Sequence, residues 1–231
     1  MTQLLDPRLA AAASYVRPGS VLADVGTDHA YLPVSLLLDG VIRFAVVSDI
    51  NEGPLERARL NAAKYGVTDR MRFVLTDGLE GLEPERDGVD DIAICGMGGE
   101  LIARIVGGSD YTRKPGVRLI LQPMSSPEEL RSFLAESGYA ILDERLCRAA
   151  GKIYACLSVE YDGIRREYTP AELLLGQANI EKRESLFGKF AETWLRRLDT
   201  QIAGRLKGNL SVEREEVLRE EILSILKKDT I

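Results

Sequence analysis

One stretch, Val21–Pro33, constrains the fold of this chain more than any other. It opens with the apolar run Val21–Val25, interrupted only by Asp24, which is typical of a buried parallel strand. Gly26 then permits a sharp turn, and Tyr31–Leu38 is a run that can form a helix. A strand, a tight glycine turn and a helix make a βα unit, whose helix N-terminus can hold a nucleotide-like ligand. The stretch therefore predicts an α/β protein with a ligand site at this turn.

The same unit recurs along the chain as far as Tyr161. Apolar runs typical of strands alternate with segments typical of helices, and the expected strands are Val21–Val25, Phe44–Ser48, Met71–Leu75, Asp91–Cys95 and Val117–Leu121. Two further strands, Ala140–Leu146 and Ile153–Tyr161, are joined by a short turn containing Gly151, which predicts an antiparallel hairpin at the sheet edge. Together these patterns predict an open, doubly wound α/β sheet of seven strands.

Three helix starts carry capping signals. Asp6 before Pro7 predicts an N-cap and a first helical residue, with the helix stopped by Pro18–Gly19. Asn51 is placed to cap the helix that follows the second strand. Ser126–Glu129, with Pro127 at the first helical position, is typical of a capping box.

The pattern changes after Asp162. Apolar residues recur there at three- and four-residue steps on either side of Gly208–Asn209: Ala191, Leu195, Leu198, Ile202, Leu206, Leu218, Ile222 and Ile225. This spacing predicts two helices joined by a tight turn, as an αα-hairpin or a short antiparallel coiled coil. We therefore expect an α/β domain over residues 1–161 and a helical domain over residues 162–231.

Charge and cysteine usage narrow the function classes. The net charge is −6, which argues against indiscriminate coating of nucleic acid. All of this excess lies before Asp162, so the neutral C-terminal part could still contact phosphates through doublets such as Arg196–Arg197, or could simply face solvent. The three cysteines are widely spaced, which predicts reduced thiols in a cytoplasmic protein and no metal site. Neither a membrane-spanning run nor a signal peptide is expected.

The polar residues that could bind a ligand follow the predicted strands. In a doubly wound sheet the ligand lies across the carboxyl ends of the strands. Asp49 stands where a carboxylate accepts ribose hydroxyls, and Asp77 stands where it can accept from an adenine amino group. Asp28 would repel a pyrophosphate but suits a sulfonium or ammonium group, which favours S-adenosylmethionine over NAD. The predicted cofactor site comprises Asp24, Gly26, Thr27, Asp28, His29, Asp49, Ile50, Asn51, Asp77, Gly78, Leu79, Cys95, Gly96 and Met97.

Four ordered motifs carry a family resemblance. The segments DVGTDHAYLP, TDGL, CGMGGELI and LILQP resemble those of the bacterial tRNA (adenine-22-N1)-methyltransferase family, from about Leu4 to Tyr161 and more weakly in the helical tail. The resemblance implies a class I methyltransferase domain with a Rossmann-like sheet and a C-terminal coiled-coil domain. It also implies methyl transfer from S-adenosylmethionine to N1 of an adenine in the tRNA D-arm. One departure is Met124, which stands where the family usually has asparagine after Gln-Pro.

The chemistry of N1 methylation suggests roles for the residues around the first turn. The product base is cationic, so a nearby carboxylate would stabilise the transition state, and Asp28 is the first candidate. His29 is a second, as a proton acceptor or base-positioning group, or merely as a structural hydrogen bonder. Tyr31 could stack on the adenine or pack in the core. The predicted substrate-binding residues are Gly98, Gly99, Gln122 and Pro123.

Other functions stay open on the sequence alone. The same cofactor could serve another RNA, a protein or a small molecule. Because of Met124, the chain could also be a module that binds RNA and cofactor with little turnover. The helical hairpin could clamp the RNA or serve dimerisation and packing, although a monomer is favoured.

Overall fold

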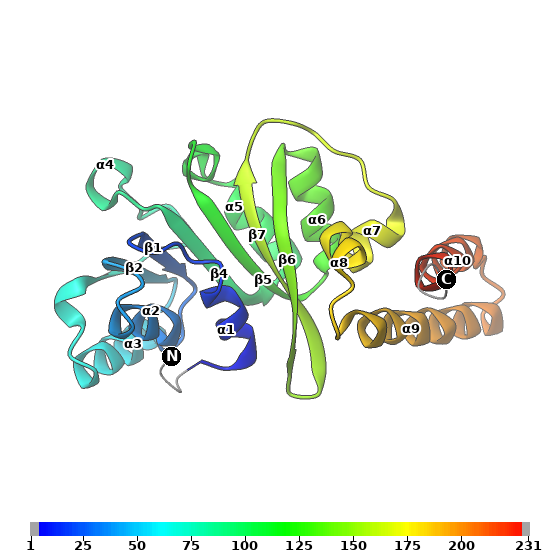
Figure 1. Ribbon diagram of the computed structural model, residues 1–231, viewed down its shortest axis with the longest axis horizontal. Helices are drawn as coiled ribbons and strands as arrows, with labels where there is room; N and C mark the ends of the chain where they lie inside the picture. Colours follow the sequence, from blue (N-terminus) through cyan, green and yellow to red (C-terminus); the bar gives the residue numbers. More distant parts are fainter. Residues whose placement is uncertain (1–4, 228–231) are drawn as a thin grey trace.

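The computed structural model describes residues 5–227, so the outer ends of both expected domains lie outside the described residues. One seven-stranded sheet has the order β3-β2-β1-β4-β5-β7-β6 (Figure 1). Its strands are β1 Val21–Val25, β2 Phe44–Asp49, β3 Met71–Leu75, β4 Asp91–Gly98, β5 Arg118–Ser125, β6 Tyr139–Ala149 and β7 Lys152–Tyr161. The central strands pair in parallel, and β7 runs antiparallel to both β5 and β6. This confirms the expected Rossmann-like sheet.

Three strands run at least three residues further than the sequence predicts: β6 at the hairpin, where it ends at Ala149, and β4 and β5 at the carboxyl edge of the sheet. β4 continues to Gly98 and β5 to Ser125, with register shifts between Cys95 and Gly98. The glycines of this segment are typical of a turn, but here the two strands go on pairing irregularly past it. The extension brings the two strand ends together at the carboxyl edge of the sheet.

Helices cover both faces of the sheet, as a doubly wound fold requires. The helices α1 Pro7–Ala13, α2 Tyr31–Leu38 and α3 Glu52–Lys64 share one apolar cluster with Leu22 of β1. The other cluster holds α5 Gly99–Gly107 and α6 Pro127–Glu136, together with Val21, Ala23 and Val25. Neighbouring residues of β1 thus point to opposite faces, and burial of both explains the continuous apolar run of this strand.

All three residues hold the N-cap positions that the sequence predicts, but only the first makes a capping hydrogen bond with its side chain. The Asp6 carboxylate accepts from the backbone N–H of Arg8 and of Leu9, each at 2.9 Å. Asn51 holds the N-cap position of α3, but its side chain makes no capping hydrogen bond. Ser126 makes none either, because its backbone is left-handed, with φ +48°. The expected capping box therefore does not form.

Several smaller elements differ from those that the sequence predicts. α1 ends at Ala13, before the expected stop at Pro18–Gly19. The short helices α4 Pro84–Asp87, η1 Thr68–Arg70 and η2 Asp110–Arg113 were not predicted. The hairpin turn between β6 and β7 is confirmed, since Ala150 and Gly151 both have positive φ, which is the signature of a type I′ turn.

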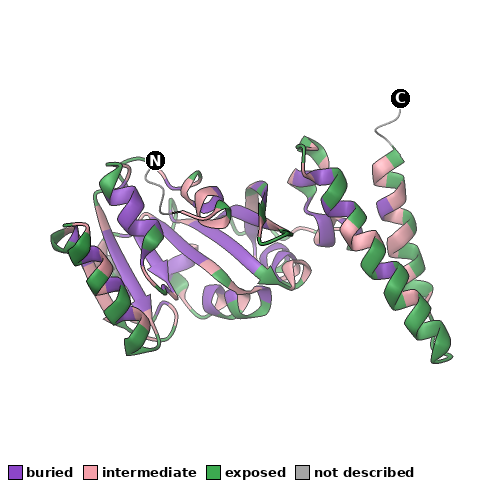
Figure 2. Cartoon of the chain, turned by 90° about the horizontal axis from the view of Figure 1, so that it is seen from below, coloured by how far each residue is buried: buried purple, intermediate pink, exposed green. Residues whose placement is uncertain are grey.

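From Pro170 to Lys227 the C-terminal part is mainly helical. It holds α7 Pro170–Leu175, α8 Gln177–Lys182, α9 Phe187–Lys207 and α10 Glu213–Lys227. The hairpin of α9 and α10 was predicted, and the two short helices before it were not. The hairpin extends away from the sheet, and its far end is largely exposed (Figure 2). No helix within residues 5–227 is long and apolar enough to cross a membrane.

The helical part shares its core with the sheet. Leu174, Phe187, Phe190 and Ile222 belong to the apolar cluster that covers α5 and α6. The hydrophobic core therefore includes residues from both sides of residue 161. The division of the chain into two domains at this point stays a prediction.

Candidate cofactor and substrate site

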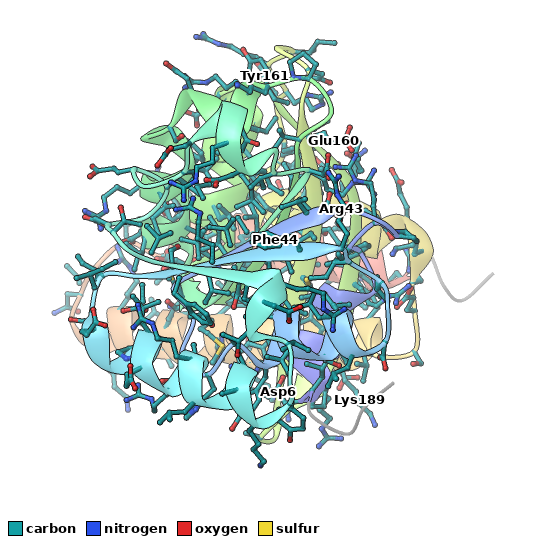
Figure 3. The ribbon with its side chains drawn as sticks, turned by 90° about the vertical axis from the view of Figure 1, so that its left-hand side faces the viewer. Asp6, Arg43, Phe44, Glu160, Tyr161 and Lys189 are labelled. Carbon is teal, nitrogen blue, oxygen red and sulfur yellow. The ribbon has the colours of Figure 1, made fainter. Side chains whose placement is uncertain are left out.

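The candidate site lies at the carboxyl edge of the sheet. Figure 3 shows Arg43 and Phe44, at the start of β2, near the middle of the view, and Tyr161, at the end of the antiparallel β7, at its top. Asp6 lies at the opposite end of the molecule in this view. There, a cleft of about 320 Å³ brings together residues predicted from separate strand ends: Asp24, Gly26, Thr27, Asp28, His29, Tyr31, Cys95, Gly96 and Gln122.

The turn after β1 is held by backbone contacts to β2. The N–H groups of Gly26 and Thr27 donate to Ser48 O at 2.8 and 3.1 Å. Gly26 has φ +73°, and a Cβ there would lie 1.8 Å from Met97 Cε. Thr27 Oγ1 accepts from Ala30 N at 3.0 Å, just before α2. Glycine at position 26 therefore allows both the positive φ and the close approach of the Met97 side chain.

Asp24 is a buried carboxylate at the end of β1, with 7% of the residue exposed. Burial raises its pKa from 3.8 to about 6, and a hydrogen bond from Thr27 acts in the opposite direction. A desolvated carboxylate beside the glycine turn is suited to a cationic group of a ligand. Asp24 therefore fits the ammonium or sulfonium that S-adenosylmethionine carries.

Asp28 and His29 form one connected group with α3. Arg57 donates through Nε to Asp28 Oδ1 at 3.0 Å, and its Nη2 donates to the same oxygen. His29 Nε2 lies 3.3 Å from Asp28 Oδ2, and the His29 ring stacks on Tyr31 with centroids 5.1 Å apart. Asn61 Nδ2 donates to His29 O at 2.8 Å. An exposed acid, an imidazole and an aromatic ring are thus fixed side by side at the mouth of the cleft.

The adenosine-binding residues that we predicted are only partly gathered. Asp77, Gly78 and Leu79 line a separate recess of about 140 Å³, against Arg104 of α5. Asp49, Ile50 and Asn51 line neither recess, and the Asp49 carboxylate accepts from Asn51 N at 2.7 Å. Their part in cofactor binding stays a prediction.

The substrate residues we predicted after β4 and β5 also separate. Gln122 is buried in the cleft wall, and its Oε1 accepts from Gly96 N at 3.2 Å. Gly99 is buried instead beneath the next loop, where a Cβ would lie 2.1 Å from Ser126 O. Gly98 and Met97 line no part of the cleft, whereas Pro123 lines a different groove described below. The roles of the two glycines in substrate binding stay predictions.

Cys95 lies in the cleft but has little thiolate character. Desolvation raises the pKa of its thiol well above 9.0, and Cys156 and Asp24 raise it further. A thiol held in its protonated form is a poor nucleophile. This agrees with an alkyl transfer that needs no covalent enzyme intermediate.

Sequence reasoning missed four residues that line the cleft, Arg8, Leu9, Ala30 and Leu32, and it also missed Arg57, which contacts Asp28. Arg8 lines the cleft, and its Nη1 lies 3.0 Å from Met124 Sδ, although the two residues are 116 positions apart. Nothing distinguishes such arginines from ordinary surface residues in the sequence. No group of three or more His, Cys, Asp or Glu side chains that could hold a metal was found among the described residues.

Comparisons with known proteins decide the family. The methyltransferase-domain family matches residues 5–157. The tRNA (adenine(22)-N(1))-methyltransferase of Bacillus subtilis (strain 168) is 34% identical over 192 residues, covering 80% of this chain and 79% of the relative. The chain belongs to the tRNA (adenine(22)-N(1))-methyltransferase family.

Solved structures of this family agree along almost the whole chain. The crystal structure of the B. subtilis m1A22 tRNA methyltransferase TrmK has a TM-score of 0.80 at 29% identity, covering 97% of each chain. Streptococcus pneumoniae Sp1610, solved in complex with S-adenosyl-L-methionine, has a TM-score of 0.83 at 32% identity, covering 95% of this chain and 99% of the other. S-adenosylmethionine is thus the cofactor of the family, and the residues of the cleft fit it.

Proposed function

We propose that this protein transfers the methyl group of S-adenosylmethionine to N1 of adenine 22 in tRNA. The observation that carries the proposal is the cleft itself. Its buried Asp24 and glycine turn suit the cofactor, and the exposed group of Asp28, His29 and Tyr31 lies at its mouth. Membership of the family supports the choice of reaction and substrate.

The reaction asks for orientation and charge stabilisation. S-adenosylmethionine supplies the methyl group on a sulfonium. The lone pair of adenine N1 forms the new N–C bond as the S–C bond breaks, so the positive charge moves onto the base. Positioning in a desolvated cleft supplies much of the rate enhancement of such a transfer. A carboxylate beside the base stabilises the charge as it develops.

The geometry supports separate roles for the three side chains at the mouth. Asp28 would face the developing cation, with Arg57 fixing one of its oxygens and leaving the other toward His29. His29 would hold the base or accept a hydrogen bond from it. Tyr31, stacked on His29 and 38% exposed, would offer an aromatic face to the adenine.

The proposed partner is a folded tRNA in the cytoplasm. A base inside a folded tRNA must swing out of its stack to enter such a cleft. The hairpin of α9 and α10 lies beyond the sheet and would contact the RNA outside the cleft (Figure 2). The three cysteines are free, which suits a reducing compartment.

The test uses labelled S-adenosylmethionine and tRNA transcripts with either adenine or guanine at position 22. We expect labelling of the adenine transcript alone, with 1-methyladenosine as the product identified by mass spectrometry. Equal labelling of both transcripts would overturn the proposed target. Labelling of neither would favour another substrate, or a binding module in which Met124 has removed turnover.

A further inference from the structure

A second concave surface lies next to the cofactor cleft. We call it the hairpin–α9 groove. Its volume is about 510 Å³, and it runs between the β6–β7 turn, with Arg148 and Lys152, and α9, with Lys189 and Arg196. Figure 1 shows the β6–β7 turn projecting beside the start of α9. The end of β5 and the start of α6, Pro123–Pro127, complete the lining.

The groove concentrates cations that have no protein partner. Arg148, Lys152, Lys189 and Arg196 are all exposed, and within residues 5–227 none of them forms an ion pair or a side-chain hydrogen bond. Glu192 is the acidic side chain of the lining. Like charges gathered without partners create a positive potential that attracts an anion.

Two arginines near the cofactor cleft, unlike the cations of the groove, form ion pairs within the protein. Arg8 is paired with Asp6, and Arg57 with Asp28, each within hydrogen-bond distance. In the groove, by contrast, four cations that are unpaired within the described residues line one concave surface, so together they can attract an anion from outside the chain.

The groove begins where the cofactor cleft ends. Gln122 lines the cleft, and the two residues after it, Pro123 and Met124, line the groove. Arg8 lines the cleft as well and reaches across to Met124 Sδ. A polymer whose one base enters the cleft therefore meets the groove with the part of its backbone next to that base.

We infer that the hairpin–α9 groove binds phosphates of the substrate RNA on the strand that carries the methylated base. The inference rests on the proposed function for the identity of the polyanion, and on charge and continuity for its position. Lys189 and Arg196 are seven residues apart on α9, two helical turns and ~10 Å along one face. The opposite wall adds Arg148 and Lys152, so an RNA strand between them would be held from two sides.

The test measures tRNA binding by the full-length protein as a function of salt. The variant K152A/K189A/R196A removes three groove cations. We expect the slope of log Kd against log salt to fall by roughly 2 to 3, because each lost phosphate contact contributes ~0.7 to 0.9. The KM for tRNA should rise about tenfold or more at 150 mM salt, while kcat and the Kd for S-adenosylmethionine stay unchanged.

A matched control distinguishes the loss of cations from the groove from a general loss of positive charge. The variant K64A/K114A/R165A removes three exposed cations that lie outside both the groove and the α9–α10 hairpin. Equal salt slopes for the two triple variants would overturn the inference, and so would a fall in kcat without a change in KM. If the variant K152A/K189A/R196A lost binding to phosphatidylglycerol vesicles but kept its tRNA affinity, the groove would be assigned to a lipid surface and the inference would also be overturned.

The outcome is separable from that of the proposed function. Binding and its salt slope are measured without turnover, so the groove can be confirmed even if adenine 22 is not the target. Conversely, methylation of the adenine transcript alone, with identical binding by both triple variants, would support the function and reject the groove.

Discussion

At the scale of a single residue, the charged carboxylate of Asp24 is unfavourable for folding because it is buried, although the same charge suits the proposed cofactor. Its carboxyl is buried, and its pKa of about 6 in the folded chain compares with an ordinary value of 3.8. Between these two values the folded state holds a proton that the unfolded state releases. The free energy of unfolding of the ligand-free protein therefore falls as pH rises from about 4 to about 6, by roughly 3 kcal/mol for this residue.

The variant Asp24→Asn tests this opposition. At pH 7.5 we expect the free energy of unfolding of the ligand-free variant to exceed that of the wild type by about 2 kcal/mol, because the buried charge is gone. The gain should vanish near pH 4, where the wild-type carboxyl is protonated. Binding of S-adenosylmethionine should weaken by about tenfold or more in calorimetry, since its cationic group loses a partner. Stability that is unchanged at both pH values would contradict the assigned burial cost.

Asp28 is the second residue whose role can be tested alone. Its side chain is 67% exposed at the mouth of the cleft, so its removal leaves the core intact. We expect Asp28→Ala to lower kcat by ~10² or more, because the developing positive charge on the base loses its carboxylate. The Kd for S-adenosylmethionine should stay within about threefold. A loss of cofactor binding instead would place Asp28 in the cofactor site.

The variant Arg57→Met offers a partner measurement for Asp28. Arg57 contacts the carboxylate and does not line the cleft, so it is a positioning residue. We expect kcat to fall less than for Asp28→Ala, with KM for tRNA nearly constant. If kcat were unaffected, the orientation of Asp28 would not depend on α3.

At the scale of elements, one buried polar cluster joins the sheet to the helices after it. Arg131 of α6 donates through Nε to Glu144 of β6 at 2.7 Å, and both side chains are fully buried. Arg131 also donates to the carbonyl of Leu173 at the end of α7, and Asn179 of α8 donates to the free oxygen of Glu144 at 2.9 Å. Each partner of the ion pair thus also hydrogen-bonds to a helix that the sequence did not predict, while Nη2 of Arg131 is buried without a partner among the described residues.

Gly176, between α7 and α8, is fixed by this cluster. Its φ is +85°, and a Cβ there would lie 1.7 Å from Glu144 Oε2. We expect Gly176→Ala to lower the free energy of unfolding by about 3 kcal/mol or more, through both strain and displacement of the buried carboxylate. Gly40→Ala is the matched control, since Gly40 also has positive φ but nothing within 4 Å, and should cost only about 1 kcal/mol. Equal losses in urea unfolding would reject the packing argument.

These elements also show what the sequence can and cannot predict. The strands and the α9–α10 hairpin were predicted because burial imposes a regular spacing on their apolar residues. The six-residue helices α7 and α8 are too short for such a spacing to appear. The capping box at Ser126 does not form because the backbone of Ser126 is left-handed. This residue packs closely on Gly99, a tertiary contact that the local sequence does not reveal. Arg8 and Arg57 were missed for the same reason, since their contacts cross 116 and 29 residues.

At the scale of the whole molecule, the cofactor cleft and the hairpin–α9 groove depend on one continuous core. The apolar cluster beneath α5 and α6 includes Phe187 and Phe190 of α9, the helix that forms one wall of the groove. The position of this wall relative to the cleft is therefore set by buried contacts. Shape as well as charge can then define how a tRNA lies across the protein.

Removal of residues 163–231 tests this dependence. The truncated chain would lose the carbonyls and the amide that satisfy Arg131 and Glu144, and it would uncover the apolar cluster. We expect its free energy of unfolding to fall by roughly 3–5 kcal/mol in urea, as for a buried ion pair stripped of its partners. Substitution of Arg131→Met and Glu144→Leu in the truncated chain should restore part of this loss, because no buried charge then lacks a partner. A truncated chain as stable as the full-length protein would show two independent domains, and only then could a loss of tRNA affinity on truncation be attributed to removal of the hairpin alone.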